Sequence, residues 1–76
     1  MISARQIRAA RALLRWSQQK LADKAIVSLN AVTRLEREEV DPRVSTLRAV
    51  QTALIKAGIE FIPADRKGEG VRLLRP

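Results

Sequence analysis

The sequence lacks several residue types on which catalytic and metal sites depend. Its 76 residues include no cysteine, no histidine and no tyrosine. Without cysteine the chain forms no disulfide and offers no thiolate ligand to zinc. Without histidine it loses the commonest acid–base group and the base of the serine and cysteine triads. The sequence therefore predicts no catalytic residue, no metal site and no cofactor, and we expect a protein that is not an enzyme.

Acidic residues are scarce as well. Fifteen Lys and Arg residues stand against eight Asp and Glu, a net charge of +7, and eleven of the cations are Arg. Such an excess favours nucleic acid, an anionic membrane or an acidic protein as a partner, although it could also serve solubility alone. No apolar run approaches the ~18 residues of a membrane-spanning helix. We expect a cytoplasmic protein with no membrane partner.

The length allows one small domain, covering residues 1–76. A core of this size is marginal on its own and usually needs a disulfide, a metal or a second subunit. Because cysteine and histidine are absent, the sequence predicts a homodimer.

Apolar residues recur with helical spacing in four segments. We expect helices over about residues 4–14, 18–24, 29–36 and 46–57. Each is preceded by a serine suited to the N-cap, and the first serine forms a capping-box pattern with Gln6. The N-caps predicted are Ser3, Ser17, Ser28 and Ser45. The side chains predicted to face the core are Ile7, Ala10, Leu14, Leu21, Ala22, Ala25, Ala31, Val32, Leu35, Leu47, Val50 and Leu54.

After Gly58 the pattern changes to short apolar runs, IEFI and VRLL, separated by PADRKGEG. These runs predict a β-hairpin of about residues 59–62 with 71–74. The predicted fold is mainly α, with four helices, a loop at VDPRVS, and the C-terminal hairpin. The hairpin could cover its own core, pair with a second subunit, or touch DNA through Arg66 and Lys67.

The second and third predicted helices are short and joined by about four residues, which is the spacing of a helix-turn-helix. In that motif the second helix enters the major groove of DNA. One arc of helix 29–36 and its flank carries Leu29, Asn30, Thr33, Arg34 and Arg37. Asn can form two hydrogen bonds with adenine, Arg can do so with guanine, and a leucine can contact the thymine methyl group.

Residues 8–54 resemble the lambda-repressor/Cro-like helix-turn-helix family, also called the XRE family. The resemblance covers about two thirds of the chain. It rests on Arg11, Leu14, Ser17, Gln18, Leu21, Ala22, Val27, Ser28, Val32, Leu35, Glu36, Pro42, Thr46, Leu47, Val50 and Leu54. Members of this family are mostly bacterial and phage transcription regulators that bind operator DNA as dimers.

The resemblance implies roles for individual residues. It assigns base reading to Leu29, Asn30 and Arg34. It assigns contacts with the DNA backbone or the groove edge to Gln18, Ser28, Thr33, Arg37 and Arg43. It also implies an ion pair between Arg11 and Glu36 that joins the first helix to the end of the third.

Two positions depart from the family pattern. Ile26 stands in the turn where the family usually has glycine, and Glu38 stands where glycine is common. A β-branched residue is strained at positive φ, which leaves the shape of the turn open. Glu38, with Glu39 and Asp41, forms an acidic patch close to where phosphates would run.

The sequence thus predicts a sequence-specific regulator of transcription that binds double-stranded DNA. We expect a homodimeric repressor or autoregulator that reads an inverted-repeat operator through helix 29–36, in the cytoplasm at the nucleoid. The alternative is an antitoxin or anti-activator that uses the same fold to bind a regulatory protein partner. Ile26 and the acidic patch would suit such a reworked surface.

Overall fold

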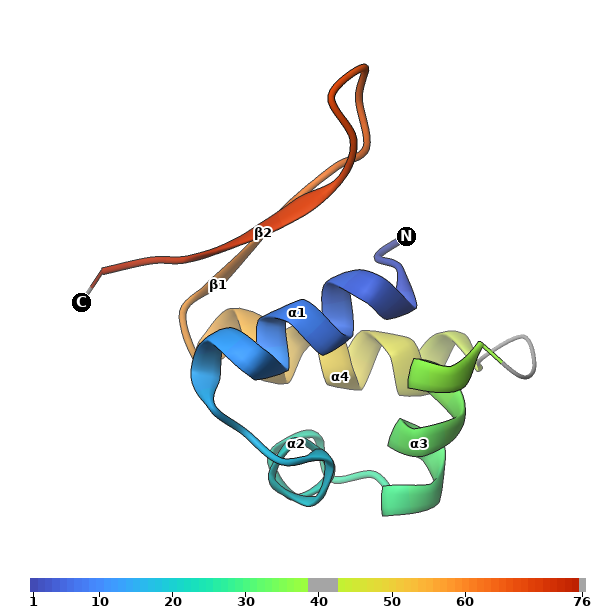
Figure 1. Ribbon diagram of the computed structural model, residues 1–76. Coiled ribbons are helices and arrows are strands. Elements are labelled where there is room, and N and C mark those ends of the chain that lie inside the picture. Colours follow the sequence, from blue (N-terminus) through green and yellow to red (C-terminus); the bar gives the residue numbers. More distant parts are fainter. Residues whose placement is uncertain (39–42, 76) are drawn as a thin grey trace.

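A computed structural model describes residues 1–38 and 43–75 of the chain. The described residues form four helices followed by an antiparallel hairpin, which confirms the predicted fold class (Figure 1). The elements are α1 (Ala4–Leu14), α2 (Gln18–Ala25), α3 (Leu29–Arg37), α4 (Val44–Lys56), β1 (Ile59–Ile62) and β2 (Gly70–Leu73). The predicted turn at Pro42 and the acidic residues Glu39 and Asp41 lie outside the described residues.

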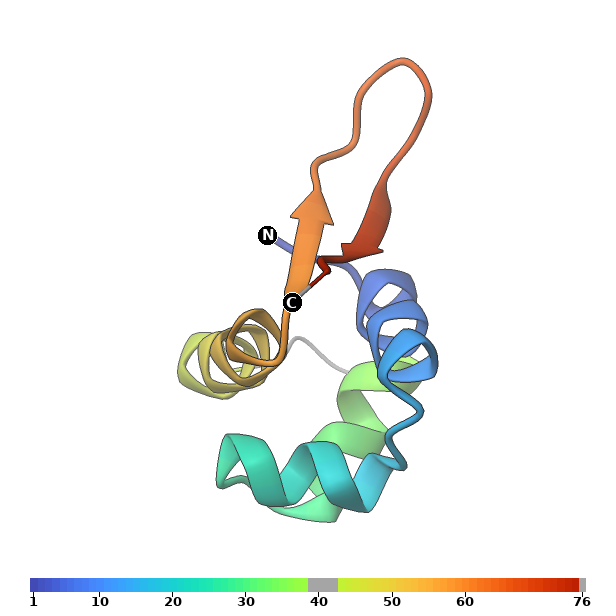
Figure 2. The ribbon, with the colours of Figure 1, turned by 90° about the vertical axis from the view of Figure 1, so that its left-hand side faces the viewer.

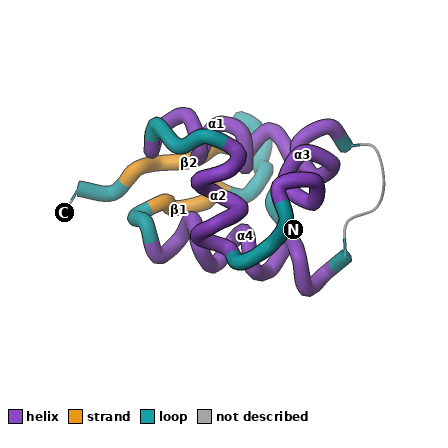
Figure 3. Tube along the Cα trace, turned by 90° about the horizontal axis from the view of Figure 1, so that it is seen from below, coloured by secondary structure: helices purple, strands orange, loops and turns teal. Residues whose placement is uncertain are grey.

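The elements are arranged in three levels. Figure 2 shows α1 and α4 on two sides of the molecule, with the hairpin above them and α2 and α3 below. Seen from below, α2 crosses from the side of α1 to the side of α4 (Figure 3). The hairpin and the α2–α3 pair therefore lie at opposite ends of the molecule.

The core fills the space between these levels. Its buried apolar residues are Ile7, Ala10, Leu21, Ala22, Ala25, Val32, Leu35, Leu47, Val50, Ala53, Leu54 and Ile59. Leu14 and Trp16 are only partly buried but pack against this cluster, and Ala31 is half-buried. The helical spacing of apolar residues thus predicted ten of the twelve buried apolar residues, but it left out Ala53 and Ile59 and included Leu14 and Ala31, which are only half-buried.

The first three helices begin as their serines predicted. The side chains of Ser3, Ser17 and Ser28 each accept a hydrogen bond from the backbone N–H three residues later, which satisfies one free donor per helix. The fourth prediction was wrong, because α4 begins at Val44, with Arg43 as its N-cap. The Leu47 N–H donates to the Arg43 carbonyl at 3.0 Å, so Ser45 already lies inside the first turn.

The helix ends also differ from prediction. Helices α2 and α3 each extend one residue further, and α4 stops at Lys56, so that Ala57 is its C-cap. Gly58 follows with φ +106°, a conformation that glycine adopts without strain. The first three helices end instead on Arg15, Ile26 and Glu38, all in the left-handed region at φ 55–58°. The turn between α2 and α3 therefore has a left-handed residue at Ile26, where the family usually has glycine.

The hairpin pairs Ile59 with Leu73 and Ile62 with Gly70, so β2 starts and ends one residue earlier than predicted. Ile59 is buried, and Phe61 and Val71 pack against the core, so the hairpin covers the core of its own chain. Arg66 and Lys67 belong to the turn between the strands. Because the hairpin projects away from α2 and α3 (Figure 1), this turn does not fit a wing on DNA held by α3.

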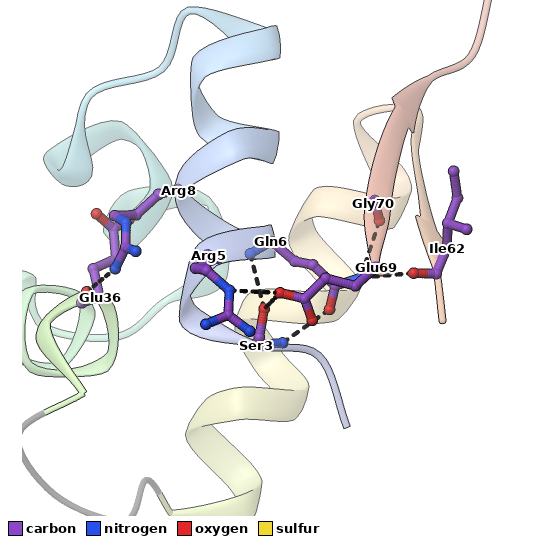
Figure 4. Close-up of polar contacts among 8 residues, drawn as sticks. All are labelled: Ser3, Arg5, Gln6, Arg8, Glu36, Ile62, Glu69 and Gly70. Carbon is purple, nitrogen blue, oxygen red and sulfur yellow. Dashed lines mark hydrogen bonds and ion pairs between the residues drawn. The ribbon is translucent and has the colours of Figure 1, made fainter. Parts of the chain in front are cut away.

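Gln6 fastens the hairpin to α1. Its amide nitrogen donates to the carbonyls of Ile62 and Gly70 at 3.0 and 2.9 Å, where the two strands end at the loop. Its amide oxygen accepts from the Ser3 N–H at 2.9 Å, which completes the capping box. Gln6 is only 5% exposed, so one buried amide serves both the helix start and the hairpin (Figure 4).

A second contact reinforces the first. The Ser3 hydroxyl donates to Glu69 Oε1 at 2.7 Å, and Arg5 Nε donates to the same oxygen at 2.8 Å. Glu69 directly precedes β2, so this carboxylate ties the loop to the N-terminus of α1 (Figure 4).

No helix within the described residues is long and apolar enough to cross a bilayer.

Candidate nucleic-acid interface

Helices α2 and α3 form a short unit joined by a tight turn. The turn is closed by the Val27 N–H, which donates to the Ala22 carbonyl at 3.1 Å. Leu21 and Val32 are fully buried and anchor the two helices in the core. Because the apolar side of α3 faces inward, its opposite side is presented to solvent.

The three residues predicted to read bases lie on this outer side. Asn30 and Arg34 are exposed, and neither side chain forms a hydrogen bond within the described residues. Leu29 is 42% exposed at the start of the helix, although it is a large apolar residue. The outer side of α3 therefore presents an amide, a guanidinium and an apolar group together.

The residues predicted to contact the DNA backbone have varied surroundings. Ser28 is exposed, and its hydroxyl accepts from the Ala31 N–H at 3.0 Å. Arg37 is exposed at the last position of α3, and Arg43 is exposed at the start of α4. Arg43 therefore lies at a helix N-terminus, where free N–H groups favour anions.

Gln18 and Thr33 form side-chain hydrogen bonds within the protein that the sequence did not predict. The Gln18 amide nitrogen donates to Glu36 Oε1 at 3.0 Å, and its amide oxygen accepts from the Thr33 hydroxyl at 3.4 Å. Both residues are half-buried. The Gln18 side chain thus holds α2 against α3, and its backbone N–H, in the first turn of α2, remains suited to a phosphate.

Behind the exposed arc lies a buried ion pair. Two Arg11 nitrogens donate to the two Glu36 oxygens at 2.8 and 2.9 Å, a bidentate geometry. Arg11 also donates to the Trp16 carbonyl at 3.0 Å. Glu36 is 4% exposed, and its carboxylate accepts three hydrogen bonds, two from Arg11 and one from Gln18. This network fixes α3 relative to α1 and α2.

The surroundings of Glu36 act on its pKa in both directions. Burial favours the neutral acid and raises the pKa, whereas the hydrogen bonds from Arg11 and Gln18 and the positive charges of Arg11 and Arg8 lower it. The favourable contacts outweigh burial, so the pKa of Glu36 lies below its ordinary value of 4.5. The carboxylate is therefore ionised at neutral pH.

Sequence reasoning missed the role of Arg8. Its guanidinium donates to the backbone carbonyl of Glu36 (Figure 4), one of the carbonyls left without a helical partner at the end of α3. Arg8 and Arg11 are three residues apart, so they project from one face of α1. That spacing is the only signal in the sequence, and it does not identify a backbone acceptor.

The lowered pKa of Glu36 predicts a loss of stability in acid. The ionised carboxylate contributes its full stability above about pH 4.5, and this contribution is lost as the pH falls through the lower pKa of the folded state. Urea titrations between pH 7 and pH 3 should show a falling free energy of unfolding, with a smaller fall in Glu36→Gln. Part of the fall should remain, because Ser3 and Arg5 lower the pKa of Glu69. An equal fall in both proteins would contradict the assignment.

The fold and this surface define a small helix-turn-helix domain with an exposed polar second helix. In comparison with known families, the helix-turn-helix family model matches residues 7–56, well over half of the chain. The chain therefore belongs to this XRE-type, Cro/C1-like family of DNA-binding transcription regulators. No curated protein matches the sequence significantly.

Proposed function

We propose that this protein is a homodimeric repressor or autoregulator that reads an inverted-repeat operator through α3. The observation that carries the proposal is the exposed arc of Leu29, Asn30 and Arg34 on a helix fixed from behind by Arg11 and Glu36. A binding site on a rigid helix that is held by buried hydrogen bonds loses little conformational entropy when it binds its target. Its place of action would be the cytoplasm, at the nucleoid.

A dimer is supported by exposed apolar side chains around the end of α4. Ile55, Leu73 and Leu74 are 51%, 42% and 48% exposed. The Leu74 N–H donates to the Gly58 carbonyl at 2.8 Å, so these leucines lie at the end of α4 that carries Ile55. Joining two copies would bury this surface. If the dimer holds its two α3 helices ~34 Å apart, the helices can enter adjacent major grooves on one side of the DNA.

Selection from a randomised duplex library tests the proposal directly. We expect enrichment of an inverted repeat whose half-sites lie about one helical turn, ~10 base pairs, apart. Enrichment of a single half-site would reject the dimer and keep the base-reading role. Folded protein that enriches no sequence would reject operator binding altogether.

Arg34→Ala should weaken binding to the selected operator by ~1–3 kcal/mol and relax the preference at one base position. Arg43→Ala is the matched control, because Arg43 is predicted to contact phosphate. It should weaken operator and random DNA alike and reduce the salt slope by about one. Fluorescence titrations of both variants on both duplexes measure this. Equal losses on the two duplexes for Arg34→Ala would remove Arg34 from the base readers.

A further inference from the structure

An open groove of about 450 Å³ runs between the C-terminal end of α2 and the outer side of α4. Its floor contains Ala25, Ala49 and Ala53, of which the first and last are buried and the second is half-buried. Small side chains let another backbone approach closely. None of the residues predicted to read bases lines this groove.

The rim of the groove is basic. Lys24, Arg48 and Lys56 line it, all three are exposed, and none of the described lining residues is acidic. None of these three cations takes part in an ion pair or side-chain hydrogen bond within the described part of the chain. Three charges therefore surround an apolar floor without being neutralised.

Ile26 adds an exposed apolar side chain to the lining of the groove. Its side chain is 91% exposed, although its backbone has φ 55°. A β-branched residue in this conformation is a genuine outlier, and burial gives it no compensation here. The turn needs this left-handed conformation but does not need an isoleucine, since glycine would adopt it without strain, and strained backbone of this kind clusters at functional sites. An exposed isoleucine at a strained position beside a groove points to contact with a partner.

We propose that this groove docks an acidic amphipathic peptide segment of a partner protein. The carboxylates of the segment would meet Lys24, Arg48 and Lys56, and its apolar side chains would cover the alanine floor and Ile26. Charge complementarity of this kind selects the partner and speeds association. An amphipathic helix laid in an apolar groove is a recurring mode of peptide recognition.

Other occupants fit less well. A second copy related by two-fold symmetry would present the same surface to itself and bring like charges together. A DNA backbone would gain nothing from the alanine floor or from Ile26. A small molecule would stay largely in water, because six of the nine lining residues are themselves exposed, whereas small-molecule sites enclose most of their ligand.

The test is an NMR titration of the full ¹⁵N-labelled chain with a synthetic peptide of about 15 residues, roughly four helical turns. The peptide carries leucine at i, i+3, i+4 and i+7 positions and glutamate elsewhere, and a second peptide has lysine in place of glutamate. The acidic peptide should shift amide signals of residues 24–26 and 48–56, and the basic peptide should not. We expect Arg48→Glu with Lys56→Glu to weaken binding by tenfold or more, about 1.4 kcal/mol.

Two further variants make the result specific. Lys67→Glu removes the same kind of charge at the hairpin turn and should leave peptide affinity unchanged. Ile26→Gly relieves the strained backbone, so it should weaken peptide binding while the protein stays as stable or becomes more stable. Three results would overturn the proposal: shifts centred on α3, an equal effect of Lys67→Glu, or concentration-dependent shifts of residues 24–26, which lie outside the proposed dimer surface, without peptide. The last would identify a second copy as the occupant.

Discussion

Glu36→Ala is expected to destabilise the domain by about 3 kcal/mol, the lower end of the range for breaking a buried ion pair. The lower end applies because the Arg11 side chain is 23% exposed, so water partly solvates the Arg11 charge that remains after the substitution. The substitution also removes the acceptor of the Gln18 amide. A domain of this size has a total stability of about 4–11 kcal/mol, so the variant should lose a large part of it.

Urea denaturation followed by circular dichroism measures this loss, and two controls define its origin. Glu60→Ala breaks the exposed Glu60–Arg72 pair, which has the same 2.8 Å separation, and should cost less than about 1 kcal/mol. Arg11→Met combined with Glu36→Leu removes both charges and should be less destabilising than Glu36→Ala alone. A Glu36→Ala variant as stable as Glu60→Ala would show that burial adds nothing to this pair.

Gln6→Ala is expected to cost about 2–4 kcal/mol and to loosen the hairpin from the helices. The side chain makes hydrogen bonds to Ser3, Ile62 and Gly70, and its removal leaves three backbone groups to find other partners. An unsatisfied buried group costs about 1–3 kcal/mol, and water can reach part of this site. The two-stranded hairpin is too small to be stable without such attachment.

Amide hydrogen exchange measures the second effect, because β1 and β2 should lose protection before α1 and α4 do. Gln19→Ala is the matched control. The Gln19 amide bonds only Asp23, at 2.8 Å on the exposed side of α2, so its loss should cost a few tenths of a kcal/mol. If Gln6→Ala lowers the protection of all elements together, then the hairpin and the helices form a single cooperative unit and no separate loosening occurs.

The helices and the exposed arc could be predicted because their signals are local. Ser17 and Ser28 lie next to the helices that they cap, and the apolar spacing of α3 leaves Asn30 and Arg34 outside whatever the rest of the chain does. The start of α4 was predicted wrongly because serine is a better N-cap residue than arginine. The sequence therefore favoured Ser45, whereas the helix begins at Val44 with Arg43 as its N-cap.

Apart from the capping box with Ser3, the contacts of Gln6 and Gln18 could not be predicted from sequence. Gln6 reaches Ile62 and Gly70 across 56 and 64 residues, and no local rule identifies such partners. Gln18 was expected to contact the DNA backbone because the family resemblance assigns that role to it. That contact stays a prediction, but the sequence did not show that the fold also brings the Gln18 side chain beside the buried carboxylate of Glu36, which is a stronger partner for an amide than water.

The arrangement of hairpin and α2–α3 pair at opposite ends also decides how the protein can be handled. The N-terminus and the end of β2 both lie on the side of α1 and α4 that carries the hairpin, away from α3 (Figure 1, Figure 2). A fluorophore, a surface linker or a reporter fused to either end would therefore project away from the surface proposed to meet DNA. An attachment at Met1 needs a spacer, because Ser3 lies two residues further on and joins the first helix to Glu69.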